Sequence, residues 1–432
     1  MMAPEHSLLM ELLDAGNRHN PYPLYARLRE QPVPMQGRDG VVVGDYDTCA
    51  RLMRDTRLGT DRSLVEGETT GRDRLRPPTF LSMNPPDHTR LRGLVSKAFT
   101  PKRVAALAPN IQVVVDKLLT RALVKPEFDF AGEIAYTLPL TIISDMLGVP
   151  HEDMPKLESW SRAFTMVLDP VVTFRRADDS QLRSIRDARD EFANYFAQKI
   201  AERRADPQDD LITRLVQIEE RGDTLSELEV MTTCGLLLVA GHETTASLTS
   251  NALLALLRHP DQFEALRRDP SLIEGAVEET LRWDPPVQIT ARTVNEPARI
   301  AGHDLPPRAV VLILLAAANR DPAHFERPDD FDITRERVPH LAFAAGIHFC
   351  LGAPLARLEA ALLLRVFAER VEQPRLIDVE YRSHVNVRGP KRLIIGHSGA
   401  NRQVDQERNR RAEERGRADA SKPGGGAENL AS

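Results

Sequence analysis

Cys350 is the residue whose surroundings most clearly favour chemistry. It lies in the segment 343–354, FAAGIHFCLGAP, between two glycines and directly before an amphipathic segment. Glycine allows another group to approach the backbone closely, and Pro354 suits the first turn of a helix. A sulfur at a helix N-terminus is favoured as the thiolate. The pattern therefore predicts a soft anionic ligand at Cys350, whereas Cys49 and Cys234 follow the usual interpretation of a lone cysteine as a small buried apolar residue.

A second polar pattern interrupts a long apolar segment. Residues 227–257 carry apolar side chains on nearly all sides, which predicts a core helix of roughly 45 Å. The sequence Gly-His-Glu-Thr-Thr at 241–245 lies at its centre, although a glycine costs about 1 kcal/mol inside a helix and a buried carboxylate costs more unless paired. Alternatively, the helix ends here and Thr244 or Thr245 caps the next one. Continuous apolar spacing on both sides favours one helix, whose polar notch opens the core for a reaction.

Several other kinds of site are excluded. His242-Glu243 begins like the zinc motif HExxH, but Ala246 takes the place of the second histidine. No glycine-rich phosphate loop of either common type is present, so the chain carries no dinucleotide motif of its own. Three cysteines exclude a disulfide framework. A net charge of −6 and a pI of about 6.1 argue against a nucleic-acid partner.

The scaffold that must position these residues is predicted to be mostly helical. The chain has 432 residues, of which 42% are hydrophobic and 28% are charged, as in an ordinary globular protein. Apolar residues at helical spacing predict helices over 87–99, 105–124, 131–147, 155–168 and 181–204. Strand signals occur over 41–43 before a helix, over 296–314 as a hairpin around Gly302-His303-Asp304, and near 375–396.

One large domain is expected over 20–398, because no linker or internal repeat divides this range. Residues 1–19 are interpreted as an N-terminal extension. Residues 399–432 carry hardly any large apolar side chain and are predicted to be a disordered charged tail. No run of about 18 apolar residues is present, so we expect no membrane span. Without a signal-peptide pattern, a reducing cytoplasm is the expected location.

The cysteine segment, Phe343-x-x-Gly346-x-His348-x-Cys350-x-Gly352, resembles the haem-binding loop of the cytochrome P-450 family. Other family motifs occur in the family's order. The sequence Ala240-Gly241-His242-Glu243-Thr244 is similar to the oxygen-binding groove, and His88-Thr89-Arg90-Leu91-Arg92 to the bacterial haem-propionate helix. Glu279-Thr280-Leu281-Arg282 resembles the structural Glu-x-x-Arg motif, with Arg327 of Phe325-Glu326-Arg327-Pro328 expected as its third member.

The resemblance covers roughly residues 20–398 and is nearest to the soluble bacterial members. It implies a mainly α fold with small β-sheets, in a single large triangular domain. It places haem b (iron protoporphyrin IX) between the central long helix and the cysteine-loop helix, with Cys350 as the iron ligand. The residues implied to bind this cofactor are His88, Arg92, Ala240, Gly241, Arg292, Phe343, Gly346, His348, Cys350 and Gly352.

The basic residues among those expected to bind haem are explained by charge, because the buried haem propionates require cations. His88 and Arg92 are four residues apart and share one helix face, so both can reach one carboxylate. Arg292 and His348 are expected at the other side of the haem. Each of these basic residues taken alone also fits a solvated surface position.

The resemblance implies that Glu243 and Thr244 are the catalytic pair, which deliver protons to dioxygen in a pocket that otherwise excludes water. Thr245 is expected to bond the helix backbone instead. The substrate pocket is expected to be apolar, which fits a natural product such as a polyketide, macrolide or terpenoid. Its expected wall residues are Leu237, Val239, Val287, Gln288 and Ile289.

The function implied is a haem-thiolate monooxygenase that hydroxylates or epoxidises a small apolar molecule of secondary metabolism, using O2 and two electrons. Thiolate ligation favours O–O cleavage. A peroxygenase and a non-catalytic haem sensor are the alternatives, and the intact 240–244 groove argues against both. The electrons are expected from a ferredoxin and its reductase, delivered to a monomeric enzyme. Candidates for a basic docking patch, which also fit a solvated helix face, are Arg90, Lys97, Lys102 and Arg103.

Overall fold

Helices make up most of the computed structural model, which describes residues 8, 10–12, 14–35, 39–60, 79–168, 179–220, 222–336 and 338–400. The α-helices are α2 (Tyr22–Glu30), α3 (Tyr46–Leu52), α5 (Asp87–Ser96), α6 (Pro101–Ala106), α7 (Ala108–Ala122), α8 (Thr137–Leu147), α9 (Met154–Leu168), α11 (Asp179–Ala205), α12 (Leu211–Gln217), α13 (Glu227–Arg258), α14 (Pro260–Arg268), α15 (Ile273–Trp283), α16 (Leu315–Ala318) and α17 (Ala353–Arg370). Short 3-10 turns are η1 (Ala15–His19), η4 (His151–Asp153), η5 (Pro270–Leu272) and η6 (Gly346–His348), and η3 (Phe130–Ala135) is a π-helical turn.

Strands form small sheets at the edges of this helical body. A five-stranded sheet has the order β1-β2-β10-β7-β3, and a three-stranded sheet has the order β12-β13-β4. The larger sheet consists of β1 (Val33–Pro34), β2 (Gly40–Val43), β3 (Leu58–Gly59), β7 (Ile289–Val294) and β10 (Val310–Leu314). The smaller consists of β4 (Glu127–Asp129), β12 (Arg375–Tyr381) and β13 (Pro390–Gly396). Two-stranded pairs are β5 (Glu219–Glu220) with β6 (Asp223–Thr224), β8 (Ala298–Ile300) with β9 (His303–Leu305), and β11 (Val371–Glu372) with β14 (Gly399–Ala400).

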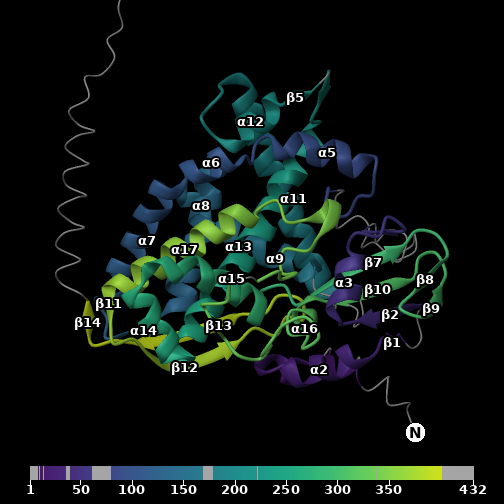
Figure 1. Ribbon diagram of the computed structural model, residues 1–432. Helices are drawn as coiled ribbons and strands as arrows, with labels where there is room; N and C mark the ends of the chain where they lie inside the picture. Colours follow the sequence, from purple (N-terminus) through teal and green to yellow (C-terminus); the bar gives the residue numbers. More distant parts are fainter. Residues whose placement is uncertain are drawn as a thin grey trace, which may run out of the picture.

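Helix α13 runs through the middle of the molecule, and Figure 1 shows other helices around it and the larger sheet at one corner of a triangular outline. Its N-terminus is fixed by a capping box, in which Ser226 and Glu229 each satisfy the other's backbone N–H. It packs against α8, α9, α11, α15 and α17. The helix continues for 32 residues through Gly241. The prediction of one central helix is therefore confirmed, and the alternative of a helix end at Thr244 or Thr245 is wrong.

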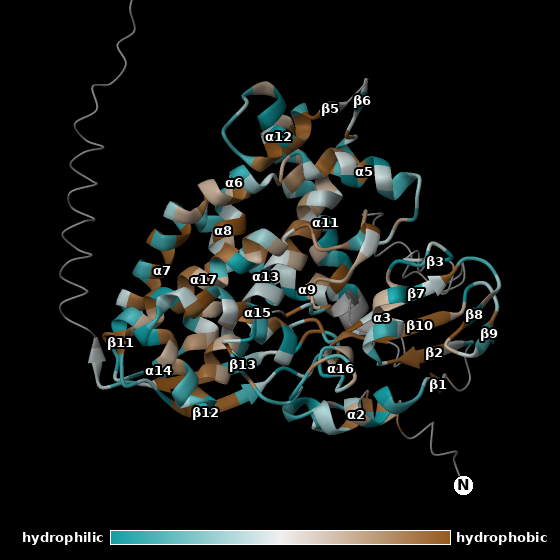
Figure 2. Ribbon diagram, viewed as in Figure 1, coloured by the Kyte–Doolittle hydropathy of each residue, from teal (hydrophilic) through white to brown (hydrophobic). Residues whose placement is uncertain are grey.

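The hydrophobic core follows the apolar periodicity of the helices. One cluster of buried side chains joins α7, α8, α13, α15 and α17, and a second joins α5, α9, α11 and α13. Strands β2 and β10 are hydrophobic along their lengths in Figure 2, and each of their residues is buried. This composition is typical of strands that are covered on both faces.

Most of the predicted elements are present. The helices predicted over 87–99, 105–124, 155–168 and 181–204 correspond to α5, α7, α9 and α11, and the one over 131–147 divides into η3 and α8. The hairpin predicted over 296–314 is wrong in its pairing. The turn at Ala301-Gly302 joins β8 to β9, whereas β10 pairs with β7 and, in parallel, with β2. Because both faces of β10 are apolar, it becomes a central strand instead of the arm of an exposed hairpin.

The two ends of the predicted domain are partly described. Leu12 and Arg18, in the predicted extension, are buried. Gly399–Ala400 forms β14, two residues beyond the predicted boundary. The rest of the predicted tail lies outside the described residues, so the domain limits stay a prediction.

The N-terminal segment is tied to the C-terminal part of the chain by Arg388. Its guanidinium donates hydrogen bonds to the backbone carbonyls of Arg18 and His19, and to Asp284 Oδ1 at 2.8 Å. Tyr22 donates to the same carboxylate oxygen at 2.5 Å. The contact between Arg388 and Arg18 joins residues 370 positions apart in the sequence.

Candidate active site

The cysteine loop holds Cys350 directly before the first turn of α17. The Cys350 backbone N–H donates to Phe343 O at 2.9 Å, which closes the loop. Gly346 has a φ of +69°, and a Cβ there would lie 2.7 Å from Met53 O, so the tight path of the loop against α3 requires glycine. Loop and helix together fix the direction of the sulfur.

The thiol of Cys350 is accessible, unlike those of Cys49 and Cys234, which are buried as predicted. Desolvation nevertheless raises the pKa of the Cys350 thiol, while backbone N–H groups of Gly352 and Ala353 and the charge of Arg92 lower it. Cys350 is therefore open to a ligand, although the protein around it removes much of the water that would solvate a thiolate. The two N–H groups favour the thiolate there.

Histidine side chains meet beside this loop. The rings of His88, from α5, and His348 lie with their centroids 4.3 Å apart. His88 is 2% exposed, and neither of its ring nitrogens has a hydrogen-bond partner. His348 Nε2 lies 3.3 Å from Thr60 Oγ1. Buried unpaired nitrogens cost free energy, so these rings have hydrogen-bonding capacity directed at something other than the protein.

Two arginines complete a basic cluster with these histidines. Arg92 donates to the Phe349 carbonyl. Arg292, in β7, is 5% exposed, and within the described ranges its guanidinium donates to Thr290 Oγ1 and Ala291 O. Desolvation lowers the pKa of Arg292 to about 10. Desolvation, together with repulsion from His88 and the two arginines, lowers the pKa of His348 to about 3.

The basic cluster (His88, Arg92, Arg292 and His348) makes no ion pair with a carboxylate among the residues that the structure describes. Buried charges in proteins are ordinarily paired. A ligand with two carboxylates beside Cys350 would neutralise the arginines and supply acceptors for the histidines. The cluster therefore fits the two propionates of haem.

The metal-binding capacity of the chain agrees with this fit. In the described segments, no three His, Cys, Asp or Glu side chains converge on a point. Cys350 alone cannot form a complete coordination shell for a bare metal ion. It suits an iron whose remaining equatorial ligands come from a porphyrin.

One face of α13 is open although the helix lies in the core. Ala240 and Gly241 are exposed and Thr244 is partly exposed, whereas His242 and Glu243 are buried. A Cβ added to Gly241 would meet nothing within 4 Å. Ala240 and Gly241 each lie about one helical turn before Thr244, so the three residues share a face of α13. They are the groove residues predicted from the sequence.

The Thr244 hydroxyl bonds the backbone of its own helix, a contact that we expected from the sequence for Thr245. The Thr244 hydroxyl donates to Ala240 O at 2.5 Å. Such bonds from threonine to the carbonyl four residues earlier bend helices locally. The hydroxyl oxygen keeps lone pairs for a donor in the open groove.

Glu243 is a buried carboxyl with an unsatisfied oxygen. It is 2% exposed, and its Oε2 atom has no hydrogen bond. Burial raises the pKa of Glu243, and the charges of Arg382, His384 and Arg162 oppose this effect. The nearest of these groups is His384, whose Nδ1 lies 3.8 Å from Glu243 Oε2. Sequence reasoning missed His384, since no motif connects the loop after β12 with the middle of α13.

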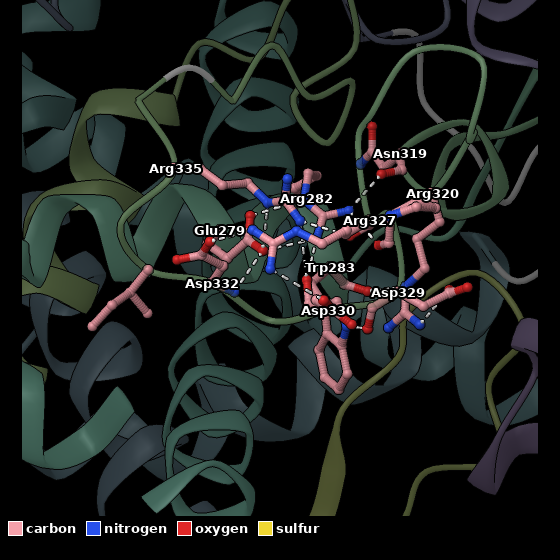
Figure 3. Close-up of polar contacts among 12 residues, drawn as sticks. Glu279, Arg282, Trp283, Asn319, Arg320, Arg327, Asp329, Asp330, Asp332 and Arg335 are labelled. Carbon is pink, nitrogen blue, oxygen red and sulfur yellow. Dashed lines mark hydrogen bonds and ion pairs between the residues drawn. The ribbon is translucent and has the colours of Figure 1, made fainter. Parts of the chain in front are cut away.

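The Glu-x-x-Arg pair is fully buried at the centre of a network of polar contacts (Figure 3). Arg282 donates to Glu279 Oε1 and Oε2 at 2.7 and 2.8 Å. The third arginine is Arg335, which donates to Glu279 Oε1 at 3.1 Å. The prediction that Arg327 is the third member of this network is wrong. Its side chain is 60% exposed and pairs with Asp330 and Asp332.

The predicted substrate residues are divided between surface and core. Leu237 and Val287 are partly exposed, whereas Val239, Gln288 and Ile289 are buried. The Gln288 amide nitrogen donates to Pro285 O at 2.6 Å, so it is not free to bind a substrate. The contribution of the whole set to a pocket stays a prediction.

In the predicted docking patch, Arg90 is committed to other contacts. It forms ion pairs with Glu229 at 2.6 Å and Asp223 at 2.8 Å, which join α5 to α13 and β6. The guanidinium of Arg90 is thus engaged within the fold, and the docking patch as a whole stays a prediction.

The basic cluster yields a prediction about cofactor retention. Arg92→Ala and Arg292→Ala should each weaken haem binding, since each removes one charge partner of a propionate, at a cost of a few kcal/mol at most. The double variant should lose more haem than either single variant, measured as the haem-to-protein ratio after dialysis and as the melting temperature. Arg90→Ala on the same helix is the control. Unchanged occupancy in the double variant would contradict the assignment.

Comparisons with known proteins agree with this site. The family model described as Cytochrome P450 matches residues 2–370. Cytochrome P450 107B1 of Saccharopolyspora erythraea is 40% identical over 88% of this chain and 95% of its own length. Vitamin D(3) 25-hydroxylase of Pseudonocardia autotrophica is 38% identical over 87% of this chain and 93% of its own length. The structure of the Bacillus subtilis Bacillaene Polyketide Synthase Cytochrome P450 PksS matches with a TM-score of 0.82 and 33% identity, covering 90% of this chain and 99% of that one.

The chain belongs to the cytochrome P450 family, and it is a haem-dependent monooxygenase by family. The mainly α fold with small sheets, inferred from the cysteine loop and the other motifs, is confirmed. Within the described ranges, no helix is both long and apolar enough to cross a membrane.

Proposed function

We propose that this enzyme inserts one oxygen atom of O2 into a small apolar natural product, by hydroxylation or epoxidation. The observation that carries the proposal is the basic cluster beside an accessible cysteine, because this combination matches one ligand, a haem with two propionates. The iron of a thiolate-ligated haem b supplies oxygen activation when it is bound.

The residues of this chain have separate tasks in that reaction. Cys350 binds the iron, and the Gly352 and Ala353 N–H groups stabilise its negative charge. The basic cluster neutralises the propionates and orients the cofactor. Phe343, with the Arg357 guanidinium 4.6 Å from its ring centroid, shields the sulfur side from water.

Proton supply is the task of α13. The Thr244 hydroxyl lies on the open face and can hold a water or an oxygen-containing group in the groove. Glu243 is buried beside it, and its raised pKa lets it hold a proton at a higher pH than a free glutamic acid does.

The substrate is proposed to be a polyketide, macrolide or terpenoid. Leu237 and Val287 would offer it apolar contacts. Two relatives support this class, since one is named a vitamin D(3) 25-hydroxylase and the other a cytochrome P450 of a polyketide synthase. We propose a ferredoxin with its reductase as electron donor, a monomeric state and a cytoplasmic location.

The direct test is isotopic. Haem-loaded enzyme with a surrogate ferredoxin and reductase is supplied with ¹⁸O2 and vitamin D3 or a macrolactone as probes. The monooxygenase should incorporate one ¹⁸O atom per product. A product that forms only with hydrogen peroxide would indicate a peroxygenase, and a ligand-induced shift of the haem absorption without any product across an apolar panel would indicate a sensor.

Thr244→Ala should separate electron use from product formation. The change keeps a small residue in the groove, so substrate binding and haem reduction should persist while the hydroxyl is lost. Product per electron should fall by about tenfold or more, as is typical when a group that assists proton transfer is removed, and hydrogen peroxide should accumulate. Peroxide added to the variant should restore part of the activity.

Two variants control this experiment. Thr249→Ala removes another back-bonded threonine of α13, whose hydroxyl donates to Thr245 O, and it should remain coupled. Glu243→Gln should slow turnover instead. A fully coupled Thr244→Ala variant, tested with a substrate that has no hydroxyl near its reacting carbon, would show that Thr244 is only structural.

A further inference from the structure

The surroundings of Glu243 contain five groups that could affect its proton. Tyr136 precedes α8, Arg162 lies on α9, His242 is its neighbour on α13, and Arg382 and His384 follow β12. Of the residues that the structure describes, these are the titratable or charged side chains around this carboxyl. Glu158, on α9, acts on Tyr136 and pairs with Arg162 at 2.5 Å. These five groups differ in whether they can accept and release a proton near neutral pH.

Four of them cannot act as carriers near neutral pH. Arg162 and Arg382 stay protonated in proteins, so they donate hydrogen bonds but release no proton. Burial raises the pKa of Tyr136 to about 12. Burial lowers the pKa of His242 to about 3, and its ring nitrogens lie 3.0 Å from Ser161 Oγ and 3.1 Å from Tyr136 O.

His384 has the properties that the others lack. Its side chain is 26% exposed, so it touches solvent, while the side chain of Glu243 is 3% exposed. Its Nδ1 atom is unpaired and lies 3.8 Å from the unpaired Glu243 Oε2. Imidazole both gains and loses a proton near neutral pH. Two buried, unsatisfied atoms of opposite hydrogen-bonding character thus face each other between solvent and the middle of α13.

We propose that His384 is the relay residue through which protons pass from solvent to Glu243. The inference rests on the proposed function and specifies the solvent end of its proton path. His384 acts through Glu243 and does not contact the reacting atoms, so its role is one of supply and positioning.

The transfer balances without any oxidant or reductant. Imidazolium gives its Nδ1 proton to Glu243 Oε2, which leaves neutral imidazole and a carboxylic acid. The acid releases the proton toward the Thr244 side of the helix. The neutral ring keeps its proton on Nε2, so a rotation of the partly exposed side chain brings Nδ1 to solvent, where a hydronium ion protonates it again and is left as water. Because 3.8 Å exceeds hydrogen-bond length, a bridging water or a small rotation of either side chain closes the gap.

The test compares His384→Asn, which keeps hydrogen bonding but cannot carry a proton, with His303→Asn. His303 is a partly exposed histidine in β9 and serves as the matched control. The first measurement needs no turnover. An infrared pH titration follows the Glu243 carboxyl, whose band is identified by its loss in Glu243→Gln. Without the nearby imidazolium, the midpoint of Glu243 should rise by about 1 pH unit or more, and His303→Asn should leave it unchanged.

The second measurement is the pH dependence of turnover with vitamin D3 as the probe and with surrogate redox partners. If imidazolium is the donor, the wild-type rate should fall when rising pH removes the proton that the donor passes on. His384→Asn should turn over at least about tenfold more slowly, lack this falling limb, and show a larger ratio of rates in H2O and D2O.

Each outcome decides the proposal. If His384→Asn leaves the titration midpoint of the Glu243 carboxyl unchanged, the two side chains do not interact. A midpoint that moves while the rate, pH limb and isotope ratio stay as in His303→Asn shows a neighbour without a relay role, and so does a slower variant that retains the limb. If wild-type enzyme forms no product while the infrared midpoint moves, the proposed function fails and the His384–Glu243 interaction stands without the relay.

Discussion

Cys350→His will retain part of its haem but lose oxygenation and the absorption band of the reduced carbon monoxide complex that gives the family its name. Imidazole binds haem iron, and the basic cluster still holds the propionates, so binding should not be abolished. What disappears is the thiolate, whose electron donation favours O–O cleavage. The backbone N–H groups of Gly352 and Ala353, which stabilise an anionic sulfur, then face a neutral ring.

The measurement combines the carbon monoxide difference spectrum with product formation. Product should fall below detection, which means a decrease of at least about a hundredfold when an essential catalytic group is removed. Cys49→Ala is the matched control, because Cys49 is buried in another cluster, and it should keep both the band and the activity. A Cys350→His enzyme that oxygenates its substrate at the original rate would contradict the ligand assignment.

Arg282→Ala should prevent the chain from accumulating in folded form. The guanidinium donates to both oxygens of Glu279 and to three backbone carbonyls, those of Asn319, Pro328 and Asp330. Removal leaves a buried carboxylate with less compensation and takes this donor from the carbonyls of Asn319 and Pro328, while Asp330 O keeps only the bond from Arg335 at 3.3 Å. Breaking a buried ion pair costs about 3–5 kcal/mol, which is a large share of the roughly 5–15 kcal/mol that stabilises a folded domain.

The roles of Arg335 and Arg327 supply a comparison within the same network. Arg335→Ala should lower the free energy of unfolding by about 1–3 kcal/mol, since it removes a charged hydrogen bond to Glu279. Arg327→Ala should change it by less than about 0.5 kcal/mol, because that side chain is exposed. Urea unfolding of the haem-loaded proteins measures both values. A larger loss for Arg327→Ala would restore Arg327 as the third member of the network.

Local patterns were sufficient to predict the elements and motifs of this chain. The glycines around Cys350 impose a loop that is readable from a few residues, and the apolar spacing of 227–257 defines a helix without reference to partners. Burial of Cys49 and Cys234 follows from the usual behaviour of a lone cysteine as a small apolar residue. In each case the determining residues lie within one or two turns of each other.

The errors arose where the path of a loop decides which side chain arrives. Arg327 and Arg335 both precede the cysteine loop, and only the fold of 319–336 directs the second one to Glu279. His384 lies beside Glu243, although it comes from a segment about 140 positions later in the chain. The pairing of β10 with β2 and β7 depends on burial of both its faces. Such pairings depend on tertiary contacts, which no local spacing records.

Arg388 imposes an order on synthesis. Residues 14–30 leave the ribosome long before Arg388, yet the backbone carbonyls of Arg18 and His19 obtain their donor from this arginine, made 370 and 369 residues later. At about 5–20 residues per second, that interval lasts roughly 20–70 s. During it, the apolar face of α2, with Leu24, Tyr25 and Leu28, has no C-terminal partner to anchor it. Helix α2, although synthesised early, is therefore secured late.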